Sequence, residues 1–320
     1  MSRAIAVTGG SGFIGSQVVR TLLEQGASRI VVVDNLLTGR AENLEDVKGP
    51  VDFIRADIRD YAAMESAFEG CDAVVHLAAI PSVPRSIEDP EACHDVNING
   101  TFNVYRACVK RGVRRVVFAA SSAAYGDTEV LPKTEAMAPR PKSPYAAHKV
   151  LGEMYTSVFS ECFRFDGVAL RFFNVYGPRQ DPTSAYSGVL SIFMKCILEE
   201  RPPTIHGDGE QSRDFTYVED VAGLVVKAID ASGVSGKVIN AGNGNRYTLN
   251  EVWQTLKRIT GSKVEAVYGP SRAGDVRDSQ ADTTLAVSLL AHAPRFSLED
   301  GLRLTFDWYK ADAAKRVAVR

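Results

Sequence analysis

The sequence predicts an α/β protein, built as a doubly wound parallel sheet with a smaller, discontinuous C-terminal lobe. Two observations indicate this class. Over residues 1–173, short apolar β-prone segments alternate with amphipathic helical segments, which is the pattern of parallel strands joined by crossover helices. After residue 173, loops rich in Gly, Pro and Asp alternate with short helices. We expect the sheet domain to hold residues 1–173, 215–242 and 279–292, and the lobe to hold residues 174–214, 243–278 and 293–320.

The composition is typical of a soluble globular protein. Hydrophobic residues make up 45% of the 320 residues, charged residues 24%, and the net charge is −2. No broad basic surface is expected, so we predict no nucleic-acid or membrane partner. The five cysteines show no C-x-x-C spacing, so neither a disulfide framework nor a zinc site is expected, and a reducing cytoplasm fits best.

The first strand is expected at Ala4 to Thr8, before a glycine-rich loop and a helix that runs to Glu24. Glycines allow a tight turn, and the free N–H groups at a helix start suit a pyrophosphate, as in a Rossmann-type dinucleotide fold. A plain strand–turn–helix crossing is the alternative. The expected pyrophosphate-binding residues are Gly9, Gly12, Phe13, Ile14 and Gly15.

The second strand, Arg29 to Val33, ends in Asp34, which follows Gly15 by 19 positions. A carboxylate at this distance can accept hydrogen bonds from an adenosine ribose. This acid favours NAD over NADP. Asn35, which follows it, is a further expected cofactor contact.

Two more strands are expected at Val51 to Arg55 and at Ala73 to Leu77. After the first of them, Asp57 either touches adenine beside Ile58 or caps the helix that starts near Tyr61. After the second, Ala78 and Ala79 are small enough to let a ligand lie against the backbone, and we count Leu77 with them.

The prolines of residues 81–90 predict a loop, followed by a helix over residues 90–111. That helix carries Asn97, which could bond the cofactor or Lys149, or only bridge backbone groups. The next strand, Val116 to Ala120, leads into Ser121, a candidate site residue because it lies at a strand's carboxyl end.

Tyr145 and Lys149 are four residues apart on a predicted helix, so their side chains share one face. A phenol has a pKa of about 10, and a nearby cation favours the phenolate, so the pair could supply an acid or base near neutral pH. A chance spacing on an amphipathic helix is the alternative. Another strand, Val168 to Phe172, follows this helix.

In this order, the motifs resemble those of the extended short-chain dehydrogenase/reductases. They are most similar to the NAD-dependent nucleotide-sugar epimerases and dehydratases, particularly the UDP-glucose and UDP-N-acetylglucosamine 4-epimerases. The motifs are residues 8–15, 76–79, 121–126, 145–149, 171–180, 207–209 and 213–221. The resemblance implies bound NAD, with Tyr145 as the proton-transfer residue, Ser121 holding the sugar hydroxyl, and Lys149 lowering the Tyr145 pKa and holding the nicotinamide ribose. It also implies Asn97 and Phe172 at the cofactor.

The resemblance further implies that the lobe binds a UDP-sugar. Two arginines near one diphosphate make sense as charge-assisted donors, although either could form a surface ion pair instead. His206 stands where the family often has an aromatic residue near uracil. The implied substrate residues are Ser82, Arg85, Ser121, Ser122, Ala123, Tyr145, Phe173, Asn174, Gly188, Val189, His206, Arg213, Arg272, Asp275 and Ser279.

The residues after Ser121 favour one reaction class. The family's dehydratases carry Asp-Glu there and its decarboxylases a Glu in the second position, whereas this chain has Ser122 and Ala123. Reversible oxidation of one carbinol remains, which is what epimerisation needs, and the resemblance implies that this carbon is C4. The small Ser279 lies where epimerases restricted to unacetylated sugars carry a tyrosine, so N-acetylated sugars are expected to fit. The alternatives are a dehydrogenase or reductase that releases its cofactor, a dehydratase, and an NAD-sensing regulator without activity.

Two helical segments are apolar on more than one face. One carries Phe102, Tyr105 and Val109, and the other spans residues 155–163. The resemblance implies that these helices pair across a homodimer interface; a surface loop that covers the extra stripe is the alternative.

Overall fold

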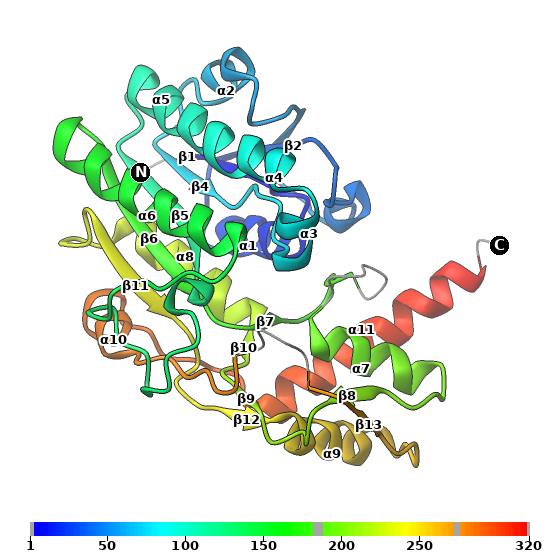
Figure 1. Cartoon of the computed structure of the whole chain (residues 1–320). Coiled ribbons are helices and arrows are strands. Elements are labelled where there is room, and N and C mark those ends of the chain that lie inside the picture. The colour runs from blue at the N-terminus through cyan, green and yellow to red at the C-terminus, as the bar shows by residue number, and fades with distance from the viewer. Residues whose placement is uncertain (1–2, 182–187, 272–275, 319–320) are drawn as a thin grey trace.

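The structure is a computed structural model that describes residues 3–181, 188–271 and 276–318. Its centre is a parallel sheet of seven strands in the order β11-β6-β5-β4-β1-β2-β3 (Figure 1). The strands are β1 (Ala4–Thr8), β2 (Arg29–Asp34), β3 (Val51–Arg55), β4 (Ala73–His76), β5 (Arg115–Ser121), β6 (Asp166–Phe172) and β11 (Lys237–Ala241). The sheet confirms the predicted α/β class, since the strand order reverses direction on either side of β1.

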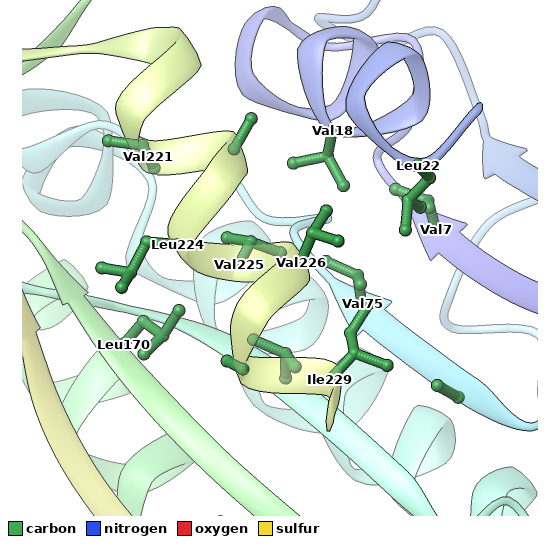
Figure 2. Packing of buried hydrophobic residues seen from close by; sticks show 14 of the residues in the cluster. Val7, Val18, Leu22, Val75, Leu170, Val221, Leu224, Val225, Val226 and Ile229 are labelled. Atoms are coloured by element: carbon green, nitrogen blue, oxygen red, sulfur yellow. The ribbon is translucent and has the colours of Figure 1, made fainter. Parts of the chain in front are cut away.

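Helices cover both faces of the sheet, because the central strands are apolar on both sides. On one face lie α1 (Phe13–Glu24), α8 (Val218–Asp230) and α10 (Thr284–Leu290), and on the other α2 (Tyr61–Ala67), α5 (Thr101–Arg111) and α6 (Pro144–Cys162). Figure 2 shows the first face, where apolar side chains of α8 meet Val18 and Leu22 of α1 and Val7 and Val75 of the sheet.

A separate hydrophobic core lies under α7 (Val189–Leu198), α9 (Leu249–Thr260) and α11 (Leu298–Ala318). The rings of Phe193 and Trp253 are 5.2 Å apart in it. Figure 1 shows these three helices grouped outside the layers of the sheet. The short strands of this region are β7 (Val175–Tyr176), β8 (Thr204–His206), β9 (Ser212–Arg213), β10 (Thr216–Tyr217), β12 (Tyr247–Thr248) and β13 (Val267–Gly269). No helix in the described ranges is both long and apolar enough to span a membrane.

Two segments differ from expectation. Residues 81–90 are not all loop, because α3 (Val83–Glu88) forms there. Its N-cap Ser82 accepts a hydrogen bond from the Arg85 N–H, and Pro84 lies in the first turn, where a missing N–H costs little. The predicted helix over residues 90–111 is also interrupted: α4 (Pro90–His94) and α5 flank a π-helical turn, η2 (Asp95–Gly100).

Two ion pairs join the loop after β2 to the segment after β7, and we call them the clasp. Arg40 Nη2 lies 2.5 Å from Asp181 Oδ2, and Arg179 Nη2 lies 3.2 Å from Asp46 Oδ2. Asp46 also pairs with Arg20 of α1. The clasp therefore ties the sheet to the chain that leads into the second core.

Candidate active site

The structure brings five sequence-predicted residues to one edge of the sheet. Gly9 and Leu77 directly follow β1 and β4, and Asp34, Ser121 and Phe172 are the last residues of β2, β5 and β6. Because the strands are parallel, these positions all lie at their carboxyl ends. This edge is where doubly wound sheets bind ligands.

The glycine loop is tightly closed. Gly9 has φ +71°, and a Cβ on it would lie 2.8 Å from the Ala78 nitrogen. A Cβ on Gly15 would lie 2.1 Å from the Gly9 oxygen, so neither position tolerates a side chain. Helix α1 begins at Phe13 with no side-chain cap and no acidic residue in its first turn. Its first N–H groups can therefore receive an anion.

Asp34 is held by the glycine loop. Its Oδ2 accepts from the Ser11 N–H at 3.0 Å and its Oδ1 from the Leu36 N–H at 2.8 Å. Burial raises the Asp34 pKa, and these two hydrogen bonds act in the opposite direction. The carboxylate is thus fixed beside the loop that would cradle a pyrophosphate.

Asp57 does not cap the helix after it, because Asp60 takes that role by accepting from the Ala63 N–H. Asn35 Nδ2 donates to Asp57 Oδ2 at 2.9 Å, which joins two predicted cofactor residues. The hydrogen bond from Arg59 lowers the Asp57 pKa to about 2. The Ile58 side chain is buried in the core.

Helix α6 places Tyr145 and Lys149. Ser143 caps it by accepting from the Ala146 N–H, and the Tyr145 N–H donates to Ser86 Oγ of α3 at 3.1 Å. Lys149 is 5% exposed, and its Nζ donates to the Ala119 carbonyl oxygen of β5 at 2.7 Å. The lysine is therefore anchored two residues before Ser121.

Ser121 and Tyr145 interact, and their interaction bears on proton transfer. Burial raises the Tyr145 pKa, and the hydrogen bond with the Ser121 side chain acts in the opposite direction. Burial lowers the Lys149 pKa to about 8, while the charge of Glu153 acts in the opposite direction. Lys149 Nζ bonds Ala119 and lies 5.9 Å from the Tyr145 ring centre, so the expectation that Lys149 lowers the Tyr145 pKa stays a prediction.

Asn97 bridges backbone, which was one of its predicted alternatives. Its Oδ1 accepts from the Ile80 N–H at 2.8 Å, and its Nδ2 donates to the Ile80 oxygen at 3.2 Å. It therefore shapes the chain after Ala79 rather than bonding Lys149. The Phe173 side chain is also fully buried, against Tyr125, so it is not accessible to a substrate in this geometry.

The substrate residues predicted in the lobe lie on short strands and loops. Arg213 Nη1 donates to the carbonyl oxygens of Ser212 and Arg277, and the Ser279 N–H donates to the Ser212 oxygen at 3.1 Å. His206 Nδ1 lies 3.1 Å from the Pro270 oxygen.

The other substrate residues predicted in the lobe divide into three groups. Asn174 Nδ2 donates to the Asp214 oxygen at 3.3 Å. Gly188 and Val189 form the start of α7. Arg272 and Asp275 lie outside the described residues.

Ser122 and Ala123 lie in the short turn η3 (Ser122–Tyr125) that follows Ser121. The next carboxylate along the chain, Asp127, is exposed and pairs with Lys142 at 3.2 Å. Asp127 therefore takes part in an ion pair on the surface of the protein.

Three buried features near the site were not predicted. Ser86 bonds the Tyr145 N–H, His76 lies between the hydroxyls of Thr8 and Thr101, and Glu153 pairs with Arg171. Glu153 left a signal in the sequence, since it follows Lys149 by four residues, and His76 and Arg171 lie within the motifs over residues 76–79 and 171–180.

A family model described as the NAD dependent epimerase/dehydratase family matches residues 5–242. The chain belongs to this family. A UDP-glucose 4-epimerase of Mycolicibacterium smegmatis is 37% identical over 309 residues, with 95% of this chain and 97% of that protein covered. A UDP-glucuronate 4-epimerase of Thermodesulfobacterium geofontis is 34% identical over 314 residues, covering 95% of each.

Solved structures resemble this epimerase/dehydratase over nearly its whole length. The UDP-N-acetylglucosamine 4-epimerase of Methanobrevibacter ruminantium, in complex with UDP-N-acetylmuramic acid, has TM-score 0.93 and 35% identity, and covers 97% and 99% of the two chains. The Thermotoga maritima UDP-glucose 4-epimerase with UDP-glucose has TM-score 0.92 and 39% identity over the same shares. The Thermus thermophilus UDP-glucose 4-epimerase complex with NAD has TM-score 0.87 and 37% identity, covering 96% and 99%.

The cofactor of this epimerase/dehydratase is NAD. Its residues fit a dinucleotide on three counts: the glycine loop leaves no room for side chains, the α1 N-terminus is uncapped, and Asp34 is fixed beside both. In addition, the Ser11 hydroxyl is buried without a hydrogen-bond partner among the described residues. A polar ligand would satisfy it.

Proposed function

We propose that this protein is a UDP-hexose 4-epimerase that acts through a transient 4-keto sugar with tightly bound NAD. One observation carries the proposal: Ser121, Tyr145 and Lys149 meet at the carboxyl edge of the sheet, and the positions after Ser121 hold Ser122 and Ala123 instead of acids. Such a site can move one proton and align one hydride transfer, and the two positions after Ser121 offer no second acid for loss of water.

Each group has a proposed role. Tyr145 as phenolate accepts the proton of the sugar 4-OH, and Ser121 holds that oxygen. NAD, held by the glycine loop, Asp34 and Lys149, would supply the hydride acceptor for C4 and the hydride donor for the other face of the sugar. Tyr145 then gives its proton back to O4, so the reaction has no net oxidation. Lys149 holds the nicotinamide ribose with the donors that Ala119 leaves free.

The proposed substrates are UDP-glucose and UDP-galactose, together with the N-acetylated pair. The partly buried Ser279 is small, and its N–H is bonded to β9, which carries Arg213. A small side chain at this place leaves room for an acetamido group. Space for an acetamido group permits an N-acetylated substrate but does not require one.

The test is incubation of the purified protein with UDP-galactose, UDP-N-acetylgalactosamine or UDP-glucuronate, without added NAD, followed by chromatographic separation of the products. A 4-epimer that accumulates without cofactor consumption supports the proposal. In a parallel incubation with added cofactor, its steady consumption would identify a dehydrogenase or reductase, and a 4-keto-6-deoxy product in either incubation would identify a dehydratase. No turnover of any UDP-sugar would favour the NAD-sensing regulator.

The substrate range is tested by Ser279→Tyr, with Ser279→Ala as the matched control. We expect the tyrosine to lower kcat/KM for UDP-N-acetylgalactosamine by about ten- to a hundredfold and to spare UDP-galactose, because bulk removes space only for the acetamido group. Alanine should leave both values unchanged. Equal turnover of the N-acetylated sugar by Ser279→Tyr would refute this role for Ser279.

A further inference from the structure

An ion pair buried between α6 and β6 lies one helical turn from Lys149. Arg171 Nε donates to Glu153 Oε1 at 2.8 Å, and Arg171 Nη2 donates to Glu153 Oε2 at 2.7 Å. The side chains are only 3% and 5% exposed. Both ends of the carboxylate are therefore fixed by a two-pronged contact.

Stability alone does not account for this pair. Removing two charges from water costs several kcal/mol per ion, and their attraction offsets this cost only in part. Apolar residues of similar size would serve the α6–β6 contact as well. A nearby group that needs a fixed negative charge would account for the pair.

Lys149 is such a group. Glu153 follows it by one turn on α6, which places the two side chains on one face. On the sheet, Lys149 bonds the Ala119 oxygen of β5, and Arg171 on β6 is paired in register with the next residue, Ala120. The lysine and the ion pair thus occupy adjacent places under α6.

Apart from Tyr145, the other groups that the structure describes on the elements around Lys149 bring no negative charge. His76 on β4 is kept neutral, since burial and then the charge of Lys149 lower its pKa to about 3. His148, the neighbour on α6, also has a lowered pKa, from burial and then from His94 and Lys149. On β5 lies the Phe118 ring, 5.0 Å from Lys149 Nζ. Tyr145 completes the α6 face, and it brings a negative charge only in the phenolate form proposed for proton transfer.

Arg171 is itself held firmly in place. Its guanidinium lies 4.5 Å from the centre of the Tyr125 ring, and the Tyr125 hydroxyl donates to Asn240 Oδ1 at 2.6 Å. Arg171, which binds the Glu153 carboxylate, is therefore linked to β11 through the side chains of Tyr125 and Asn240.

We propose that Glu153 is a positioning residue that keeps Lys149 charged at the active site, and that Arg171 holds the Glu153 carboxylate for this purpose. The proposal rests on the function proposed above, in which Lys149 acts as a cationic donor. Without the carboxylate, burial would drive Lys149 towards the neutral amine, since burial lowers its pKa and Glu153 opposes that shift.

The test is the pH profile of kcat/KM for Glu153→Gln, which removes the charge and keeps the shape. We expect the alkaline limb to move to lower pH by about one unit. A direct readout is ¹³C NMR of labelled lysine Cε atoms, with the Lys149 signal assigned by Lys149→Arg. Its titration midpoint should fall by the same amount.

Because Glu153→Gln leaves Arg171 buried without a counter-charge, the double variant Glu153→Gln/Arg171→Gln is measured as well. The matched control is Asp166→Asn, which breaks the 2.6 Å pair with Arg115 at the other end of β5 and β6. The control should keep the wild-type pH profile. The Glu153 variants could instead lose activity equally at every pH, with the alkaline limb of the kcat/KM profile and the Lys149 titration midpoint unchanged. That result would show that Glu153 has only a structural role. An inactive wild-type protein would overturn the proposed function instead, while the NMR midpoint still tests Glu153.

Discussion

Tyr145 illustrates how one residue's chemistry depends on several elements. Its backbone N–H is bonded to Ser86 of α3, and its phenol interacts with Ser121 of β5. Burial makes the phenolate harder to form, so activation must come from charges and donors at the site. Oxidised nicotinamide is itself a cation, and its binding beside the phenol would favour the phenolate.

Tyr145→Phe should lower kcat by about 10² to 10⁴-fold, because it deletes the proposed proton-transfer group and little else. The measurement is the epimerase assay above, with circular dichroism to check the fold. Tyr155→Phe, ten residues further along α6, is the control and should keep full activity. Comparable loss in both variants would contradict a specific role for Tyr145.

His76 should make the protein less stable in acid. It is 1% exposed, with its ring nitrogens 2.7 Å from Thr8 Oγ1 and 3.0 Å from Thr101 Oγ1. Burial and Lys149 lower its folded pKa to about 3, whereas the unfolded value is about 6.5. Below pH 6.5 the unfolded chain therefore binds the extra proton, and stability falls as pH falls.

The expected loss from His76 is about 2 kcal/mol of unfolding free energy between pH 6.5 and pH 5. Urea denaturation at both pH values measures it, with His76→Gln as the comparison. The variant should be less stable at pH 7 but lose less on acidification. Equal losses in the two proteins would show that His76 does not titrate on unfolding.

At the scale of elements, α5 and α6 expose a continuous apolar face. Leu151, Met154 and Val158 follow helical spacing and are 40%, 57% and 50% exposed. Phe102 of α5 lies beside them, with its ring 5.6 Å from that of Tyr155. We propose that this face pairs with its copy in a homodimer, since such a stripe is costly in water.

The double variant Met154→Glu/Val158→Glu should turn the dimer into a monomer, because it places four like charges in the paired face. Sedimentation velocity gives the mass in solution. A control with the same charge added elsewhere, Val267→Glu/Leu304→Glu on β13 and α11, should remain dimeric. A monomeric wild-type protein would overturn the interface directly.

The elements that sequence predicts well are those with a strong local pattern. Six of the seven strands of the sheet and helix α1 agree with the predicted segments closely, because apolar strand runs and a glycine loop leave few alternatives, whereas β11 was not predicted as a strand. Helix α3 was not predicted because the prolines around it favour a loop. Its N-cap residue Ser82 cannot be told apart in the sequence from a serine in a loop. Asn97 of the π-helical turn bonds Ile80, 17 residues earlier, a contact that no local pattern predicts.

At the scale of the whole molecule, the order of the motifs along the chain indicated which residues lie at the same edge of the sheet, but not the contacts that they make. It placed Ser121, Tyr145 and Lys149 at one edge, since parallel strands end together. It could not predict that Lys149 bonds Ala119, that Ser86 bonds Tyr145, or that Phe173 is buried, because each contact joins segments far apart in the chain. The division into a sheet domain and a lobe remains a prediction.

The clasp has a consequence for how long the protein retains its cofactor. Its four side chains are between 16% and 63% exposed, and they span from the loop after Asp34 to the segment leading into the second core. Exposed ion pairs weaken as the Debye length shrinks from about 10 Å at 0.1 M salt to about 3 Å at 1 M. We therefore expect less NAD to stay bound to the protein during gel filtration at high ionic strength. The variant Asp46→Asn should show the same loss already at low salt.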